Sequence, residues 1–366
     1  MHSRCNLACD YCYVYQLADQ SWRTKPKIMS MVVLRKSAMR IAEHARQHEL
    51  ARVRIILHGG EPLLAGKRFI RDAAAILRTE IPSGVQLEIT AQTNGVLLDE
   101  EFLATLLACG IGLGVSLDGH ADAHDQRRRH LDGRPSHAQV TRALRLLGGV
   151  RFRPLFRGLL CTIDLAAEPL SVYSELLSFG PPTIDFLLPH GNWASSPPGR
   201  GGHLAATPYA DWLVTIFDEW YLAPATRIRL FEAIISLLLG AGSESEQVGL
   251  GPASVVVVET DGAIEQTDAL KSAYEGAADT GLNVIDHTFT EALAHPGVMA
   301  RQAGLAGLPD DCLGCRVRNV CGGGFYPHRY HPDTGFKNRS VYCPDLLALI
   351  SHIRERVAAD LLPLRL

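Results

Sequence analysis

The chain lacks any long hydrophobic run, since none of its apolar stretches reaches the roughly 18 residues that a membrane helix needs. It also lacks charge of one dominant sign, because 36 Lys and Arg stand against 39 Asp and Glu, a formal net charge of −3. A balance this close to neutral gives no bulk attraction to nucleic acid. No apolar signal segment opens the chain, and no block repeats at a fixed period. We therefore expect a cytoplasmic globular protein that partners neither nucleic acid nor a membrane.

The 366 residues are enough for two domains or one large one, and 47% of them are hydrophobic. The chain has nine cysteines, and disulfides are rare in the cytosol, where clustered cysteines more often bind metal. Seven of the nine fall into two groups. The other two, Cys109 and Cys161, lie in apolar stretches and are expected to be small buried side chains.

The first group is Cys5, Cys9 and Cys12 in CNLACDYC, with the spacing C-x3-C-x2-C. Three thiolates are one fewer than a [4Fe–4S] cubane needs, so a cluster held by this group has one iron open to another ligand. Three ligand-type residues so close together, between polar and aromatic neighbours, are hard to explain as packing. This group predicts an iron–sulfur site with an open position.

Hydrophobic patterning after this group alternates between strand and helix. Strands are predicted at Val53–Leu57, Val85–Thr90, Gly112–Leu117, Phe156–Ile163 and Ile184–Leu188. Helices are predicted after Ser30, at Arg68–Arg78, at Glu100–Cys109 behind an Asp99 cap, at Ala138–Leu147, between the last two strands, roughly over 209–240, and over Pro344–Leu361. This alternation indicates an α/β fold with a parallel sheet and right-handed crossovers.

Three turn sequences follow successive predicted strands, namely HGGEP (His58–Pro62), TNG (Thr93–Gly95) and SLDG (Ser116–Gly119). Ligands of parallel α/β folds collect at the carboxyl ends of the strands, where these turns lie. The glycines of HGGEP let the backbone approach a ligand closely, and Glu61 offers an anionic partner. Each sequence also suits a plain turn, because Asn-Gly and Asp-Gly are turn dipeptides.

The last third of the chain no longer shows the alternation of strand and helix patterns. Asp261-Gly262 between β-branched runs predicts a hairpin with a type I′ turn. The second cysteine group follows, spaced C-x2-C-x5-C-x21-C, and four thiolates satisfy either one [4Fe–4S] cluster or a structural zinc. Its members are Cys312, Cys315, Cys321 and Cys343.

The N-terminal cysteine triplet with HGGEP downstream resembles the radical S-adenosylmethionine (radical SAM) enzymes. The resemblance implies a partial (β/α)6 TIM-like barrel in which SAM binds the open iron of a [4Fe–4S] cluster. Family members have a strand before the first cysteine, whereas only Met1–Arg4 precede Cys5 here, so this first strand is expected to be missing from this sequence, either because the start codon is misassigned or because the strand is lost.

The resemblance also implies which residues hold SAM. HGGEP takes the methionine amino group, while Thr93 and Ser116 are placed to touch the ribose and carboxylate. In HDQRR, Arg128 is favoured over Arg127 as the partner of the SAM carboxylate, unless both form a solvated basic turn. Tyr13 either packs at the cluster or contacts the adenine. The implied cofactor-binding residues are Tyr13, Gly59, Gly60, Glu61, Thr93, Ser116 and Arg128.

The C-terminal third resembles the SPASM extension of peptide-modifying radical SAM enzymes, which in full form has seven cysteines and two auxiliary clusters. Thr267 and Phe325 stand here at two cysteine positions of the first auxiliary cluster, and a third such cysteine is absent. The ligands of the second remain, so two [4Fe–4S] clusters are expected in all. By the same resemblance Asp268 is the base that takes a substrate proton, although it also suits a hairpin end.

Phrases such as HGGEPLLAG, IDFLLPHGNW and ETDGAIEQTDALKSAYEGA resemble the cyclophane-forming (Fxs-type) peptide maturases, which join an aromatic ring to a β-carbon in a ribosomal precursor peptide. The resemblance implies an electron donor such as flavodoxin or ferredoxin as a second partner. It divides the chain into a radical SAM core (1–205), a helical linker (206–250) and a SPASM-type domain (251–366). Thioether formation, sulfatase-type oxidation and a non-catalytic, metal-stabilised peptide-binding module remain alternatives.

Overall fold

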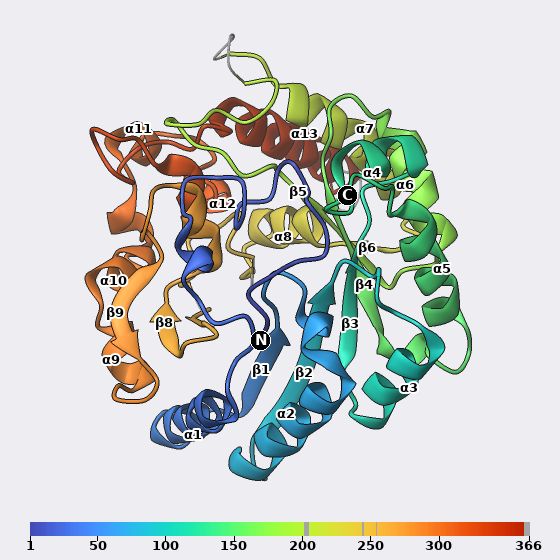
Figure 1. The fold of residues 1–366 in the computed structure, drawn as a ribbon. Coiled ribbons are helices and arrows are strands. Elements are labelled where there is room, and N and C mark those ends of the chain that lie inside the picture. Colours follow the sequence, from blue (N-terminus) through green and yellow to red (C-terminus); the bar gives the residue numbers. More distant parts are fainter. Residues whose placement is uncertain (201–204, 244, 254, 362–366) are drawn as a thin grey trace. The chain divides into compact units, whose positions relative to one another are not determined.

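The computed structural model describes residues 1–200, 205–243, 245–253 and 255–361 (Figure 1). By its contacts the chain divides into two units. The first consists of Met1–Leu160, Phe179–Pro182 and Val255–Val298, and the second of Cys161–Ser178, Thr183–Ser254 and Met299–Leu366. The boundaries of these units differ from the domain boundaries at 205 and 250 that the sequence predicts. The domain division therefore remains a prediction. Residues 255–298, which hold Asp268, belong to the same unit as the N-terminal cysteines.

A parallel sheet confirms the predicted α/β fold. Its strands follow the order of the chain: β1 (Arg52–Leu57), β2 (Gln86–Thr93), β3 (Gly112–Ser116), β4 (Phe156–Thr162), β5 (Thr183–Leu187) and β6 (Arg227–Ile228). In the first unit the register of β1 on β2 runs from Arg52 opposite Gln86 to Leu57 opposite Ala91. In the second, just past β4, the Ile163 N–H donates to the Leu187 carbonyl at 3.0 Å. Sequential strands are neighbours throughout, as expected for right-handed βαβ connections.

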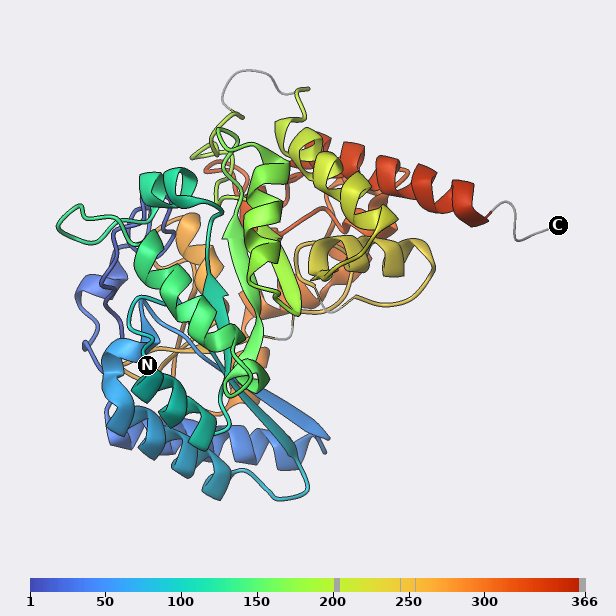
Figure 2. The same cartoon turned by 90° about the vertical axis from the view of Figure 1, so that its right-hand side faces the viewer.

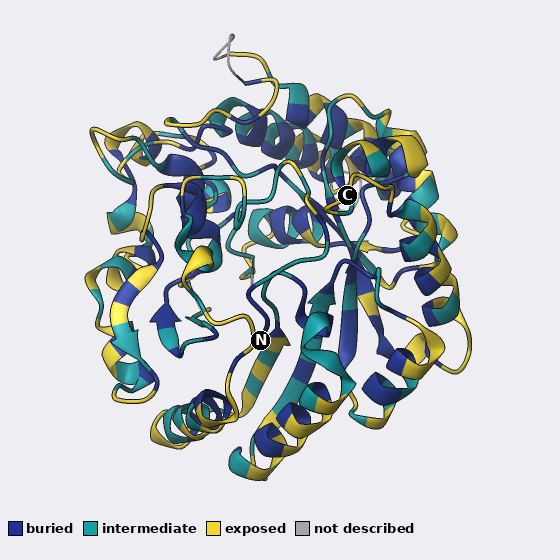
Figure 3. Cartoon of the chain, viewed as in Figure 1, coloured by how far each residue is buried: buried dark blue, intermediate teal, exposed yellow. Residues whose placement is uncertain are grey.

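Helices of the first unit flank the strands (Figure 2). They are α1 (Met31–Gln47), α2 (Gly66–Glu80), α3 (Glu100–Ala108), α4 (Ala121–Arg127) and α5 (His137–Gly148). The predicted caps are confirmed: the Ser30 side chain accepts from the Val33 N–H, and that of Asp99 from Phe102. α1 and α2 each bury one face and expose the other, the pattern of a helix that covers a sheet (Figure 3).

The second unit contains α6 (Pro169–Ser178), α7 (Pro208–Leu222), α8 (Arg229–Leu238), α11 (Asp310–Leu313), α12 (Arg318–Cys321) and α13 (Cys343–Leu361). The single helical stretch predicted over 209–240 is wrong, because α7 ends before Pro224 and β6 separates it from α8. Proline lacks the N–H that a helix interior requires, and the residue before it avoids helical backbone angles. Across the described ranges, no helix has both the length and the apolar character that crossing a membrane requires.

A small antiparallel sheet in the first unit contains β7 (Val257–Val258), β8 (Ala263–Glu265) and β9 (Asp279–Asn283), followed by α9 (Phe289–Leu293) and then α10 (Pro296–Gln302). The predicted hairpin is confirmed, but its type I′ turn is wrong. The Gly262 N–H donates to the Glu259 carbonyl, so Thr260 and Asp261 are the central turn residues. Gly262 has φ of 88°, whereas Asp261 does not take a positive φ.

Short 3-10 turns complete the described chain: η1 (Ser21–Arg23), η2 (Pro62–Ala65), η3 (Arg153–Leu155), η4 (Asp268–Ser272), η5 (Gly304–Gly307) and η6 (Tyr326–Arg329). Of these, η2 and η4 carry residues of the candidate site. η2 follows the HGGEP glycines directly, and η4 begins at Asp268.

The segment Met1–Arg4 lies beside the end of β1. His2 forms an isolated parallel bridge with Gly59, and its carbonyl accepts from the Gly60 N–H at 2.9 Å. The Arg4 carbonyl accepts from the Glu61 N–H at 3.0 Å. Within the described residues no strand precedes β1, as expected, but this short pairing fixes the chain that leads into Cys5.

A buried carboxylate, Asp345, joins two helices of the second unit and forms an ion pair. Asp345, in the first turn of α13, accepts from the backbone N–H groups of Tyr209 and Ala210 at 2.9 and 3.1 Å, and so caps α7. Its second oxygen lies 3.4 Å from Arg200, and both side chains are almost fully buried. Breaking such a pair leaves an uncompensated charge in the interior.

We predict that Asp345→Ala lowers the free energy of unfolding by about 3 kcal/mol, because it removes the cap of α7 and strands the Arg200 charge. Denaturant titration measures the loss. Glu355→Ala, at an exposed position of the same helix, is the matched control and should change stability by less than about 0.5 kcal/mol. An equal loss of unfolding free energy in the two variants would contradict the role of Asp345 as the cap of α7 and the partner of Arg200.

Candidate active site

The loop after Arg4 gathers the first cysteine group. The Cys12 N–H donates to the Cys9 carbonyl at 3.2 Å, which folds the loop back on itself. Burial raises the pKa of the Cys5 thiol to about 12 and of the Cys9 thiol to about 11, and neighbouring thiols of the group add to both shifts. Two N–H groups point at the Cys5 sulfur, from Leu7 at 3.4 Å and from the Asn94 side chain at 3.6 Å.

These features suit a cluster bound to thiolates. The N–H donors at the Cys5 sulfur and the positive charge of Arg128 near Cys9 both stabilise a thiolate over a thiol. No group of three or more His, Cys, Asp or Glu among the described residues could hold a single metal ion. In a cubane each thiolate binds its own iron, so the three sulfurs need not converge on one point.

Glu61 connects the elements around the cysteine loop. Its carboxylate is fully buried and accepts from the Leu63 N–H at 3.0 Å, capping η2. It also accepts from the Thr93 hydroxyl and the Asn94 N–H, each at 2.8 Å, at the end of β2. Burial raises the pKa of Glu61 to about 6, while these hydrogen bonds oppose the rise. The residue predicted to bind the methionine amino group thus also joins HGGEP to TNG.

The two glycines of HGGEP allow a close approach of main chain. Gly59 has φ of 148°, and a Cβ there would lie 2.4 Å from the His2 carbonyl oxygen. A Cβ on Gly60 would lie 2.5 Å from the Arg4 carbonyl oxygen. The backbone that comes close in this structure is therefore the segment leading into the cysteine loop, and any side chain at either position would push it away.

Arg128 lies buried beside the cysteine loop. It donates to the Tyr11 hydroxyl at 2.6 Å, and that hydroxyl donates to Asp118, whose Oδ2 is 3.8 Å from the guanidinium. Its Nε is buried without a hydrogen-bond partner, and its charge lowers the pKa of Cys9. A buried guanidinium with an unused N–H fits a carboxylate ligand. Arg127, the alternative, instead pairs with Asp10 at 2.9 Å.

The other predicted cofactor-binding side chains lie at carboxyl ends of strands, as expected. The Thr93 hydroxyl donates to Glu61 and accepts from the Gly95 N–H at 3.1 Å. The Ser116 hydroxyl accepts from the Gln92 side chain at 3.1 Å. These contacts fix both hydroxyls in place at the ends of β2 and β3.

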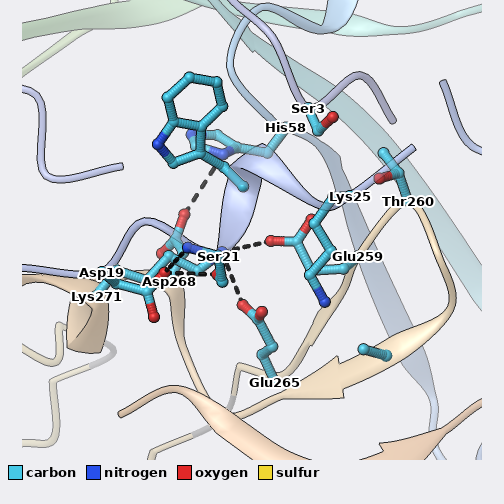
Figure 4. Close-up of polar contacts among 12 residues, drawn as sticks. Ser3, Asp19, Ser21, Lys25, His58, Glu259, Thr260, Glu265, Asp268 and Lys271 are labelled. Carbon is cyan, nitrogen blue, oxygen red and sulfur yellow. Dashed lines mark hydrogen bonds and ion pairs between the residues drawn. The ribbon is translucent and has the colours of Figure 1, made fainter. Parts of the chain in front are cut away.

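Asp268 lies near the cysteine loop and the end of β1. Its Oδ2 accepts a hydrogen bond from the Tyr13 hydroxyl at 2.8 Å and lies 3.5 Å from His58 Nδ1 (Figure 4). Tyr13 directly follows Cys12, so Asp268 is connected to the cluster loop through one side chain. A quarter of the Asp268 side chain remains exposed. A carboxylate with this access suits a proton acceptor.

A buried charge cluster anchors the turn that carries Asp268. Lys271, three residues on in η4, contacts Glu259 and lies 2.9 Å from Glu265 (Figure 4). Its backbone carbonyl accepts from the Asp19 N–H at 3.1 Å, in the segment after the cysteine loop. Burial raises the pKa of Glu265 to about 7, while Lys271 lowers it. The cluster holds η4 to both the hairpin and the N-terminal loop.

The second cysteine group is gathered within the second unit. Burial raises the pKa of Cys321 to about 12, and the Cys343 and Cys312 thiols contribute. Buried Arg329 donates to the Gly322 and Gly324 carbonyls, the latter at 2.7 Å, and has a buried Nε without a hydrogen-bond partner. Its charge lowers the pKa of Cys312 and Cys321. An unused guanidinium N–H beside the thiols fits an anionic four-thiolate centre.

Sequence reasoning missed four residues of these arrangements: Asn94, His58, Lys271 and Arg329. Asn94 and His58 stand inside TNG and HGGEP, so the motifs located them without revealing their contacts. Lys271 and Arg329 belong to no motif recognised in the sequence, although the hydrogen-bond and ion-pair partners of their side chains lie within 12 residues of them. Of the two isolated cysteines, Cys161 is buried as predicted, whereas Cys109 is only half-buried because it ends α3.

Comparison with known proteins agrees with this geometry. Residues 1–163 match the family model of the radical SAM superfamily. A serine-type anaerobic sulfatase-maturating enzyme of Bacteroides thetaiotaomicron is 26% identical over 340 residues, covering 87% of this chain and 79% of the relative. A cysteine-type anaerobic sulfatase-maturating enzyme of Clostridium perfringens is 26% identical over 273 residues, covering 73% and 72%.

The fold has a close counterpart among solved structures. Native anSMEcpe with bound AdoMet and Cp18Cys peptide matches with a TM-score of 0.82 at 22% identity, over 98% of this chain and 96% of that chain. An identity this low establishes likeness of fold and not of substrate.

The raised pKa of Glu61 predicts a pH-dependent stability. Its pKa in the folded protein, about 6, exceeds the ordinary glutamate value of 4.5, so the folded state binds more protons between these values. The contribution of Glu61 to stability is therefore present at low pH and lost as pH rises through about 6. Between pH 5 and pH 7 the loss is about 1 kcal/mol.

Glu61→Gln does not titrate and should lack this loss. The measurement is denaturant unfolding of both proteins at pH 5 and pH 7, with the change on raising the pH compared between them. Parallel changes in wild type and variant would show that Glu61 titrates normally in the folded protein.

Proposed function

We propose that this chain is a radical SAM enzyme that oxidises a side chain of a peptide or protein substrate, a proposal supported by the match of residues 1–163 to the family model of the radical SAM superfamily. The observation that carries the proposal is the placement of Asp268, a partly exposed carboxylate, against Tyr13 of the cysteine loop. A partly exposed carboxylate held against the loop that would carry the cluster suits a base for a substrate bound near that loop. We expect the substrate to be a ribosomally synthesised peptide or protein in the cytoplasm.

Cys5, Cys9 and Cys12 would hold a [4Fe–4S] cluster, and SAM bound to it supplies a 5′-deoxyadenosyl radical after one-electron reduction. Arg128 would hold the SAM carboxylate through its unused Nε, and Glu61 would use its remaining acceptor capacity for the amino group. Gly59 and Gly60 let the chain entering the loop lie against β1. The protein contributes orientation and exclusion of water.

Loss of a hydrogen atom from a β-carbon leaves a radical that must lose one proton and one electron to become a stable product. Asp268 takes the proton, while Tyr13, by donating to Oδ2, holds the carboxylate in position. Cys312, Cys315, Cys321 and Cys343 would hold the auxiliary cluster that accepts the electron. A flavodoxin or ferredoxin is the expected external donor.

Two reactions fit this sequence of losses. Oxidation of a serine or cysteine side chain is the first candidate, in line with the serine-type and cysteine-type names of the relatives. Serine would give a carbonyl directly, whereas cysteine would give a thioaldehyde that water hydrolyses to the carbonyl with release of hydrogen sulfide. Closure of a three-residue cyclophane between an aromatic ring and a β-carbon is the second, favoured by sequence phrases such as HGGEPLLAG. Both serine oxidation and cyclophane closure remove two hydrogens, so intact mass alone does not separate them.

The deciding experiment incubates anaerobically reconstituted enzyme, SAM and reductant with two peptides. One contains serine and cysteine without aromatic residues, and the other contains an aromatic residue two positions before its crosslinking partner. A carbonyl product reacts with hydroxylamine, whereas a cyclophane does not and resists fragmentation within its ring. Absence of SAM cleavage with either peptide would instead support a non-catalytic module.

Asp268→Asn should abolish proton acceptance while leaving SAM cleavage in place. We expect 5′-deoxyadenosine to form at the wild-type rate and the modified peptide to fall at least about a hundredfold. Chromatography of the nucleoside and mass spectrometry of the peptide measure the two. Asp279→Ala, at an exposed position of β9, is the control and should leave both yields unchanged. Wild-type product from Asp268→Asn would remove Asp268 from the mechanism.

The iron content tests the auxiliary site. Reconstituted wild type should bind about eight irons per chain, and replacement of Cys312 and Cys315 by alanine should leave about four, because one cluster is lost. Colorimetric iron and sulfide analysis measures this. Cys161→Ala is the matched control, since it removes a thiol outside both groups. About four irons together with one zinc in the wild type would favour the structural zinc alternative.

A further inference from the structure

We propose that His58 relays to solvent the proton that Asp268 receives from the substrate, and so restores Asp268 as a base for the next turnover. The inference rests on the proposed function of Asp268 and deepens it by naming the group through which the proton leaves. His58 acts through Asp268 and is not assigned a contact with the substrate.

The first observation is the geometry of the pair. His58 Nδ1 lies 3.5 Å from Asp268 Oδ2 (Figure 4). The same oxygen accepts a hydrogen bond from the Tyr13 hydroxyl. His58 directly follows β1, while Asp268 begins η4, so two segments some 210 residues apart in sequence converge at this contact. A carboxyl proton on Oδ2 would have an imidazole nitrogen within a short movement of hydrogen-bond distance.

The second observation is the gradient of exposure across the pair. The His58 side chain is 41% exposed and that of Asp268 25%. A proton that moves from Asp268 to His58 therefore moves toward water. Imidazole is the side chain best suited to this step near neutral pH, because it exchanges protons readily in that range.

The third observation is that both partners are held in place. The N-terminal amino group donates to the His58 carbonyl at 2.9 Å, and the adjoining Gly59 is packed against His2. On the other side, Lys271 ties η4 to Glu259 and Glu265. The backbone that carries each of the two side chains is therefore fixed.

Other ionisable groups around Asp268 suit the relay less well. Tyr13 already donates its proton to Asp268, and burial raises the pKa of its phenol well above the usual value. Lys271 is a buried cation engaged by two carboxylates. Cys12 and Glu259 act on the site electrostatically, and Cys12 is assigned to the cluster.

The step balances without any redox change. The O–H bond of the protonated Asp268 carboxyl breaks, and an N–H bond forms at Nδ1 of neutral His58. The imidazolium then gives a proton to water, which leaves neutral histidine and the Asp268 carboxylate. The electron of the substrate radical leaves separately, as in the proposed function.

The test compares His58→Ala with His58→Gln in the reconstituted enzyme. For both variants we expect unchanged iron content and unchanged SAM cleavage, with multiple-turnover product formation about ten- to a hundredfold lower. Adding imidazole at fixed pH and ionic strength should raise the rate of His58→Ala in proportion to its concentration. His48→Ala, at the exposed end of α1, should match wild type with or without imidazole.

The outcomes separate the relay from the proposed function. Full activity in His58→Gln would show that a hydrogen-bonding side chain suffices, which overturns the relay. Wild-type rates in His58→Ala, or a loss that imidazole does not restore, would overturn it too. If His58→Ala loses iron, the rate of His58→Gln decides in its place, since a ten- to hundredfold loss with unchanged iron content supports the relay and a wild-type rate overturns it. Product formation by Asp268→Asn would instead overturn the proposed base itself.

Discussion

The buried carboxylate of Glu61 is the constraint on which the rest of the site depends. It accepts from the first turn after HGGEP and from two groups of TNG, so the ends of β1 and β2 are joined by one side chain. Asn94, positioned by this contact, reaches the Cys5 sulfur. The cysteine loop is thus supported by an acid whose own burial is unfavourable, and three donors offset that cost.

The first unit has two buried cations near Glu61 and Asp268, Arg128 and Lys271, and they differ in how completely they are paired. Arg128 is buried with an unused N–H, which is costly unless a ligand completes it. The Lys271 cluster, by contrast, has its cation paired with two acids inside the protein. The first arrangement is suited to recognition, and the second to holding a turn in place. Asp268 lies at the junction, on the turn that Lys271 anchors.

Sequence patterns predicted much of this fold, because its signals are local. Hydrophobic runs located the strands, Ser30 and Asp99 marked helix starts, and Asp261-Gly262 marked a hairpin. The break between α7 and α8 was missed, although Pro224 signalled it. The turn type was missed because its central residues depend on which backbone groups pair.

The residues of the candidate site could be predicted only where they belong to a motif with a characteristic sequence spacing. The cysteine groups and the strand-end turns stand out in the sequence, and the structure brings the residues of each together. The contact of His58 with Asp268 joins segments some 210 residues apart, and that of Lys271 with Glu259 joins residues 12 apart across the hairpin. Their pairing is decided by how β8 and η4 lie in the first unit, which no local pattern encodes.

The glycine run behind Cys321 has a consequence for assembly. Gly322, Gly323 and Gly324 all adopt positive φ, and a methyl group on Gly322 would collide with the Gly249 carbonyl. Three consecutive glycines surrender more chain entropy on ordering than any other tripeptide. The free energy of metal–thiolate bonds would offset that expense, so maturation of the apoprotein and the final ordering of this loop are expected to be one coupled event.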